Sequence, residues 1–388
     1  MLLMAINRRD FLCSSLAVGC GILPNEFLSS TAYAADETQE IFAAARRHSS
    51  SETVPSYSAA LFTNAGDLRS VTLPGRGHDV AVRPQRLGEP INQSAEVVAF
   101  ARRPGRFAVA FSTNASKEPL HFFARADRHF YGHGVFSPNG KILFTTENDF
   151  ENGVGVVGIR DAANGYKQIG EFSSYGIGPH DIALLDDGIT LVIANGGLET
   201  SPETGRQVLN LTEMEPSLVY IDRRTGSLIE KQTLPSMLHQ LSIRHLTVAN
   251  KSRVVFGAQF KGPKTHIPPL IGFHDRGHEI KLVEAPKDIL HEMKNYVGSV
   301  TVDKSGDIIA ASHPRGGLIS YWDAVNRRFL GTRKLLDGCG LARTHLSGEF
   351  LQTSGTGQVE QMVLSTQVSN PFETAHNVQW DNHAILVK

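Results

Sequence analysis

The chain repeats one short unit seven times, and this repetition limits the folds open to it more than any other feature. The unit is an apolar run that opens on a polar residue, a turn rich in Gly, Asn or Asp, and a second apolar run. Residues 133–146, His-Gly-Val-Phe-Ser-Pro-Asn-Gly-Lys-Ile-Leu-Phe-Thr-Thr, form a clear copy. Other copies begin near residues 78, 180, 245, 299, 341 and 376. The period is about 47 residues, and a period of roughly 40–50 residues with several strands per repeat is typical of β-propellers.

We therefore predict an all-β fold, a seven-bladed β-propeller over residues 57–388. The seventh copy has room for only two strands, so the segments 57–62 and 68–73 are expected to supply the missing ones. Such N- and C-terminal strands would close the ring and remove an open sheet edge. A β-sandwich is the alternative, but it does not explain seven matching units.

The first 34 residues have the features of an export signal. Arg-Arg-Asp-Phe-Leu at 8–12 is a twin-arginine pattern, an apolar stretch follows, and Ala-Tyr-Ala at 32–34 is a small-x-small cleavage site. We predict a Tat-type signal peptide over residues 1–34 and a periplasmic location. Residues 35–56 are polar and rich in serine, and we expect a linker there, with a short helix over 40–47.

Composition excludes several classes of protein. Lys plus Arg number 38 and Asp plus Glu 39, so the chain lacks the basic excess of a nucleic-acid binder. No run reaches the roughly 18 apolar residues of a membrane span. Signal cleavage would leave Cys339 as the one cysteine, so no internal disulfide is expected. We expect a monomer.

Several segments together resemble one protein family. They lie at 132–140, 145–149, 176–181, 193–197, 239–245 and 314–317, the first reading Gly-His-Gly-Val-Phe-Ser-Pro-Asn-Gly. The chain resembles the Tat-exported bacterial family catalogued as domain of unknown function 1513 from about Tyr57 onward. The resemblance implies a propeller-like periplasmic protein. Members tend to be encoded beside imelysin-like and di-haem proteins of periplasmic iron handling, which are therefore the implied partners. It implies no established activity.

Histidine recurs at one place in the repeat. Three histidines stand nine residues before the start of the second strand, and two others hold the equivalent place in their blades. Because the first strand of each blade lines the channel of a propeller, these side chains are expected to converge at one channel mouth. Imidazole suits Cu, Zn and Fe, so we predict a transition-metal site. The five predicted ligands are His78, His133, His180, His245 and His376.

Nearby polar residues are further candidates for this site. Glu147 and Asp149 follow in the second strand of their unit, Asp181 follows His180, and Arg244 precedes His245. The chain has no Gly-x-Ser-x-Gly elbow, His-Glu-x-x-His, Cys-x-x-Cys-His or P-loop. Three functions stay open at this point. They are binding of a metal or a metal-handling partner, a propeller enzyme (a lactonase-like hydrolase or metal oxidoreductase), and an interaction scaffold whose histidines only lock turns.

Overall fold

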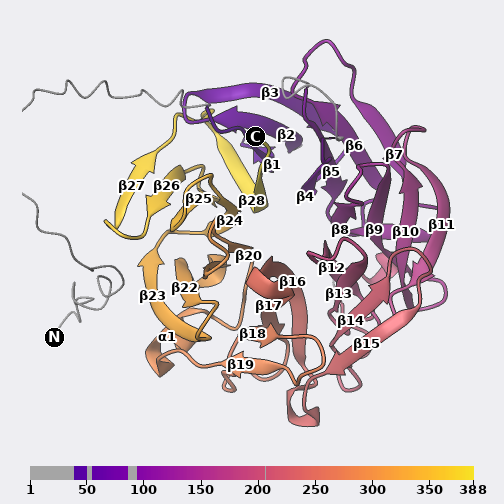
Figure 1. The fold of residues 1–388 in the computed structure, drawn as a ribbon, viewed down its shortest axis with the longest axis vertical. Helices are drawn as coiled ribbons and strands as arrows, with labels where there is room; N and C mark the ends of the chain where they lie inside the picture. The colour runs from indigo at the N-terminus through magenta and orange to yellow at the C-terminus, as the bar shows by residue number, and fades with distance from the viewer. Residues whose placement is uncertain (1–38, 50–54, 86–93, 206) are drawn as a thin grey trace, which may run out of the picture. The chain divides into compact units, whose positions relative to one another are not determined.

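The strands form seven four-stranded antiparallel sheets, set as blades around a central channel (Figure 1). The computed structural model describes residues 39–49, 55–85, 94–205 and 207–388. One short helix, α1 (Lys287–Glu292), and four 3-10 turns accompany the strands in these ranges. The predicted seven-bladed, all-β propeller is confirmed.

Six blades are continuous in sequence, and their strands run in order from the channel outward. Blade 1 contains β4 (Gly77–Val82), β5 (Glu96–Ala101), β6 (Phe107–Ser112) and β7 (Leu120–Phe123). Blade 2 contains β8 (Arg128–Phe136), β9 (Ile142–Asp149), β10 (Val154–Asp161) and β11 (Lys167–Ser173). Blade 3 contains β12 (Pro179–Leu184), β13 (Thr190–Asn195), β14 (Ser217–Asp222) and β15 (Leu228–Thr233).

The next three blades follow the same plan. Blade 4 contains β16 (Leu241–Ala249), β17 (Arg253–Phe260), β18 (Ile271–His274) and β19 (Lys281–Val283). Blade 5 contains β20 (Ser299–Val302), β21 (Ile308–His313), β22 (Leu318–Asp323) and β23 (Arg328–Lys334). Blade 6 contains β24 (Gly338–Arg343), β25 (Glu349–Ser354), β26 (Val359–Val363) and β27 (Val368–Pro371).

Blade 7 joins the two ends of the described chain. Its order is β28 (Val378–Leu386), β1 (Phe42–His48), β2 (Ser56–Thr63) and β3 (Gly66–Leu73), with β28 facing the channel. Closure by N- and C-terminal strands is therefore confirmed. The detail differs from the prediction, because 378–386 is one inner strand and it pairs with β1, not with β2 or β3.

The predicted linker at 35–56 is wrong over β1. In its sequence, Phe-Ala-Ala-Ala-Arg-Arg-His, only Phe42 favours a strand, and the three alanines favour helices. The strand forms because it lies between β28 and β2, where its first five residues are buried. Arg46 is held there by an ion pair with Asp67 and by the ring of Trp380, 5.2 Å from its guanidinium carbon. Tertiary burial thus overrides local propensity.

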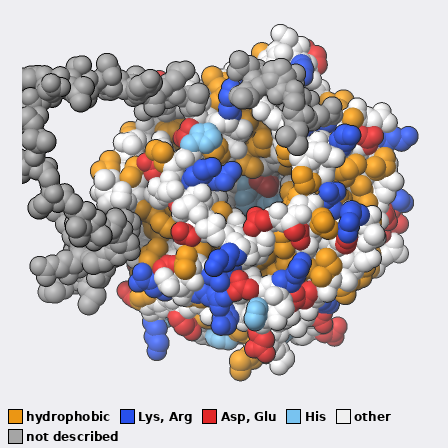
Figure 2. Space-filling model, viewed as in Figure 1, with side chains coloured by type: hydrophobic (Ala, Val, Ile, Leu, Met, Phe, Trp, Pro, Cys, Tyr) orange, Lys and Arg blue, Asp and Glu red, His pale blue; other side chains and the backbone are white. Residues whose placement is uncertain are grey.

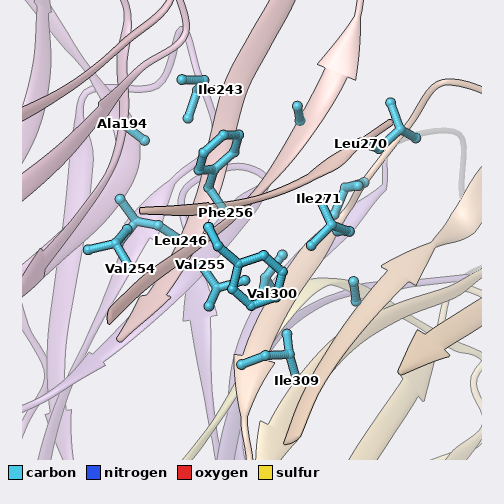
Figure 3. Close-up of a cluster of buried hydrophobic side chains, with 14 of the residues drawn as sticks. Ala194, Ile243, Leu246, Val254, Val255, Phe256, Leu270, Ile271, Val300 and Ile309 are labelled. Carbon is cyan, nitrogen blue, oxygen red and sulfur yellow. The ribbon is translucent and has the colours of Figure 1, made fainter. Parts of the chain in front are cut away.

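Apolar side chains fill the space between neighbouring blades. Figure 3 shows one such cluster, in which Phe256 of β17 packs among side chains that include Ile243 of β16 and Ile271 of β18. The repeated turns require glycine, since Gly140, Gly188 and Gly306 have φ of +63°, +64° and +79°. The packing between blades and the tight turns within them hold the inner strands in place around the channel.

The predicted signal peptide at 1–34 lies outside the described residues. None of the helices in the described part of the chain has the length and apolar character that a membrane crossing requires.

Candidate metal centre

Five histidines from five inner strands meet in the channel. They are His78 on β4, His133 on β8, His180 on β12, His245 on β16 and His383 on β28. Taken in this order and back to the first, neighbouring ring centroids are 4.9, 4.8, 4.7, 4.7 and 4.8 Å apart. Each side chain is buried, with 1–7% of its residue surface exposed. We call this cluster the histidine ring. Figure 2 shows a hollow at the centre of the propeller with histidine surface inside it.

The structure brings together four of the five predicted histidines. His376 is exposed in the turn before β28, and His383 stands at the ring instead. The placement of His376 was wrong because 376–385 was treated as two strands. These residues belong to a turn and a single inner strand, and the second strand of blade 7 is β1. The ring residue consequently lies seven positions later.

A shift in strand register accompanies every ring histidine. In β4, β8, β12, β16 and β28 the pairing with the next strand slips at the histidine or beside it. β24, which carries Leu341 at this place, also slips between Gly338 and Leu341, whereas β20, which carries Ser299, pairs without a slip. β-Bulges redirect side chains and are common next to functional sites. Here they allow adjacent residues, such as His78 with Asp79 or Arg244 with His245, to lie near the channel together.

Gly132 shows how tightly the ring is packed. It lies in the bulge of β8 with φ +105°, and a Cβ at this position would lie 2.5 Å from Cδ2 of His78. Any side chain here would displace the His78 imidazole, so glycine is required on both steric and backbone grounds.

The ring nitrogens are largely without hydrogen-bond partners. Both nitrogens of His180 and of His245 are buried and have no hydrogen-bond partner. The same holds for Nδ1 of His78, Nε2 of His133 and Nε2 of His383. Buried polar atoms are nearly always satisfied, so seven such atoms in one cluster need an explanation. In two sets the potential ligand atoms all lie within 4.8 Å of one another. The sets are His78, His133 and His383, and His133, His180 and His245.

His133 belongs to both sets and is oriented by carboxylates. Its Nδ1 lies 2.9 Å from Oδ2 of Asp79 and 3.3 Å from Oδ1 of Asp181. Because an ionised carboxylate only accepts, Nδ1 donates, and the lone pair is on Nε2, which is buried without a hydrogen-bond partner. This carboxylate–histidine arrangement is the usual one behind a metal ligand. Asp181 also accepts hydrogen bonds from the backbone of Ile182 and Leu246, which fixes its position.

Burial keeps the imidazoles neutral. It is the main cause that lowers the pKa of every ring histidine, well below 6.5 for His78, His180 and His245 and to about 4 for His383. The pKa of His133 is lowered less, because Asp181 opposes the effect of burial. Burial likewise raises the pKa of Asp181 to about 6. Neutral imidazole is the form that binds metal ions.

Glu147 and Asp149 do not join the histidine ring. Glu147 is fully buried within blade 2 and accepts from Arg160 at 2.8 Å, while Asp149 pairs with Arg128 at 3.3 Å. The expectation that they add ligands was wrong because they sit on β9, the second strand, where they face partners in their own blade. The carboxylates that do contact a ring histidine belong to inner strands.

Replacing Glu147 by Gln is expected to destabilise the fold by about 3–5 kcal/mol, because the buried Arg160 loses its counter-charge. Metal stoichiometry should not change. Urea unfolding and metal titration of the same variant measure the two effects, with Glu118→Gln on the exposed surface as the control. Lost metal binding at unchanged stability would make Glu147 a ligand instead.

Sequence reasoning missed three residues near the ring. His383 was hidden by the misplaced strand boundary. Asp79 and Asp381 were passed over, although the dipeptide His-Asp at 78–79 repeats at 180–181 and gave a usable signal. Asp381 pairs with Arg76 at 2.5 Å and with Arg102 at 3.1 Å, and one of its oxygens lies 3.5 Å from Nδ1 of His78.

Comparison with known proteins places the chain in a family. A search of curated proteins finds no significant match. Among solved structures, the hydrazine synthase of Kuenenia stuttgartiensis is similar, with a TM-score of 0.58 and 12% sequence identity over 83% of this chain and 92% of that chain. At this identity the likeness shows the fold alone. A model of the family described as "Protein of unknown function (DUF1513)" matches residues 71–387, which is most of the chain, and the protein therefore belongs to this family.

Proposed function

We propose that this propeller binds a transition-metal ion through its histidine ring. The observation that carries the proposal is the convergence of five buried imidazoles, in which seven ring nitrogens have no hydrogen-bond partner among the described residues. A buried polar atom without a partner is costly, and a metal ion would satisfy several of them at once. Imidazole donors suit Cu, Zn and Fe.

A purely structural role for these histidines accounts for less. A histidine that locks a turn uses its nitrogens in hydrogen bonds, as His313 does with Tyr296 and Ser320 at 2.9 and 2.8 Å. In the histidine ring, only Nδ1 of His133 makes such a short bond, and that bond leaves Nε2 free. This contrast with His313 supports a role of the ring histidines as metal ligands, and not as groups that stabilise turns.

The proposed setting is the periplasm. The twin-arginine pattern at 8–12 and the cleavage site at 32–34 support export of an already folded protein. A protein that holds a metal in a closed ring would benefit from folding before export. The family resemblance adds periplasmic iron-handling proteins, imelysin-like or di-haem, as the proposed partners.

Replacing His133 and His180 together by Ala is expected to abolish metal binding while the propeller still folds. Each of the two ligand sets contains His133, so the double variant breaks both. The test is titration of metal-free protein with Zn²⁺, Cu²⁺ and Fe²⁺ separately, with elemental analysis of protein purified from the periplasmic fraction. Far-UV circular dichroism checks the fold.

His376→Ala is the matched control, because this histidine is exposed outside the ring. It should bind metal as the unchanged protein does. Equal binding by the double variant, or no binding by the unchanged protein, would contradict the proposal and leave the histidines as structural groups of a scaffold.

A further inference from the structure

Arg244 is a buried cation, and no carboxylate among the described residues neutralises it. It is the extra residue in the bulge of β16, one position before His245, and 6% of its surface is exposed. Its Nε and Nη1 atoms have no hydrogen-bond partner, and no carboxylate pairs with it among the described residues. A buried, unpaired charge is strongly destabilising and calls for a counter-ion.

Arg244 lies next to the histidine ring, because it directly precedes His245 at the register shift of β16. After burial, which is the largest cause, its positive charge contributes to the lowered pKa of His78, His133, His180 and His245. A Cβ at Gly196, just after β13, would lie 3.1 Å from Nη1, so Gly196 packs closely against the guanidinium and a side chain there would crowd it. Arg244 therefore stands beside the ring, between blades 3 and 4.

Other cations gather at the same mouth of the channel. Arg102 and Arg103 follow β5, Lys261 follows β17, and Arg315 lies between β21 and β22. These loops connect the second and third strands of their blades, so they lie on the face where the inner strands begin. Burial, and after it repulsion from Arg103 and Arg102, lowers the pKa of Arg244 to about 9. Burial, and after it repulsion from Arg244, Arg315 and Arg103, lowers the pKa of Lys261 well below its usual value.

The carboxylates beside the histidine ring contact groups other than Arg244. Asp381 pairs with Arg76 and Arg102, and Asp79 lies against His133. Asp181 contacts His133 and backbone amides of β12 and β16. Arg244 is thus left without a carboxylate partner among the described residues.

We propose that the mouth of the channel is an anion site, in which Arg244 binds a small carboxylate or inorganic oxyanion beside the histidine ring. The planar guanidinium presents several N–H donors and matches the oxygens of such anions. The burial of Arg244 restricts the ligand to a small one. An anion held there would lie next to the imidazoles and could enter the channel together with a metal ion, although the site itself needs no metal.

The test uses metal-free full-length protein at constant ionic strength. Sodium phosphate and sodium acetate are titrated separately, by calorimetry and by the midpoint of thermal unfolding. We expect at least one of them to bind and to raise the midpoint, and Arg244→Met to weaken that binding at least tenfold. Binding of phosphate alone would identify an inorganic oxyanion site, and binding of acetate alone a carboxylate site.

Two variants control the result. Arg224→Met removes an exposed arginine that pairs with Asp222 in blade 3, and it should bind the anion as the unchanged protein does. Arg244→Lys keeps the charge but loses the planar donors, and should bind with intermediate affinity. Undiminished binding by Arg244→Met, or no binding of either anion by the unchanged protein, overturns the proposal. Because no metal is present, this outcome is independent of metal binding by the histidine ring.

Discussion

A chain that ends at Ala375 is expected to lose cooperative unfolding and to aggregate. The deletion removes β28, which pairs with β1 and lies against the inner strands β24 and β4. Without it, β1 becomes an open edge and the buried Phe42, Phe62 and Trp380 cluster loses its indole. Thermal and urea unfolding, with size-exclusion chromatography, measure the effect.

Two further samples make this test specific. Trp380→Ala keeps the strand and should cost about 3–5 kcal/mol while unfolding stays cooperative. A synthetic peptide of residues 376–388, added to the truncated chain, should restore a cooperative transition because it can pair with β1 as the missing strand. A truncated chain that unfolds with the midpoint of the full chain would show that β28 does not close the ring.

The metal-free protein is expected to become much less stable as pH falls below 6.5. The pKa of each ring histidine is lowered in the folded state, chiefly by burial, so the unfolded chain takes up protons that the folded chain does not. Stability therefore rises with pH and is lost on acidification from about 6.5 towards the folded pKa, about 4 for His383. Each fully buried imidazole contributes up to about 1.4 kcal/mol per pH unit in this window.

Two buried carboxyl groups oppose this loss of stability in acid. Burial raises the pKa of Asp79 and Asp181 in the folded state, so their contribution to stability grows as pH falls. Five imidazoles against two carboxylates still leave a net loss in acid. His180→Leu with His245→Leu should flatten the stability profile by up to about 3 kcal/mol per pH unit, measured by urea unfolding between pH 7 and pH 5. His129 and His313 stay in both proteins, so an unchanged slope in the double variant would contradict the assignment to the ring.

Much of the fold followed from the sequence because the repeat is visible in it. The turns at Gly140, Gly188 and Gly306 and the apolar runs beside them fixed the period, and the period indicated seven blades. β1 escaped detection because only Phe42 in Phe-Ala-Ala-Ala-Arg-Arg-His favours a strand. Its conformation depends on contact with β28, more than 300 residues later, and no local pattern reports such a pairing.

The site was predicted where strand boundaries were right. His78, His133, His180 and His245 were found because a shared register in the repeat places them on the same part of the inner strand. His383 was missed because blade 7 is split between the two ends of the chain. The place of Asp79 beside the ring depends on the register shift of β4. The pairing of Glu147 with Arg160 depends on which face of β9 its side chain lies on. Both are properties of the packed sheets.

The position of His383 also has a consequence for biosynthesis. β28 leaves the ribosome after every other described strand, so a nascent chain carries an incomplete blade 7 and at most four ring histidines. Loss of this segment through a premature stop or proteolysis removes a ligand and the closure of the propeller in one event. If the histidine ring binds a metal ion as proposed, only chains whose synthesis has reached β28 can form the complete site. Truncated chains would remain without metal.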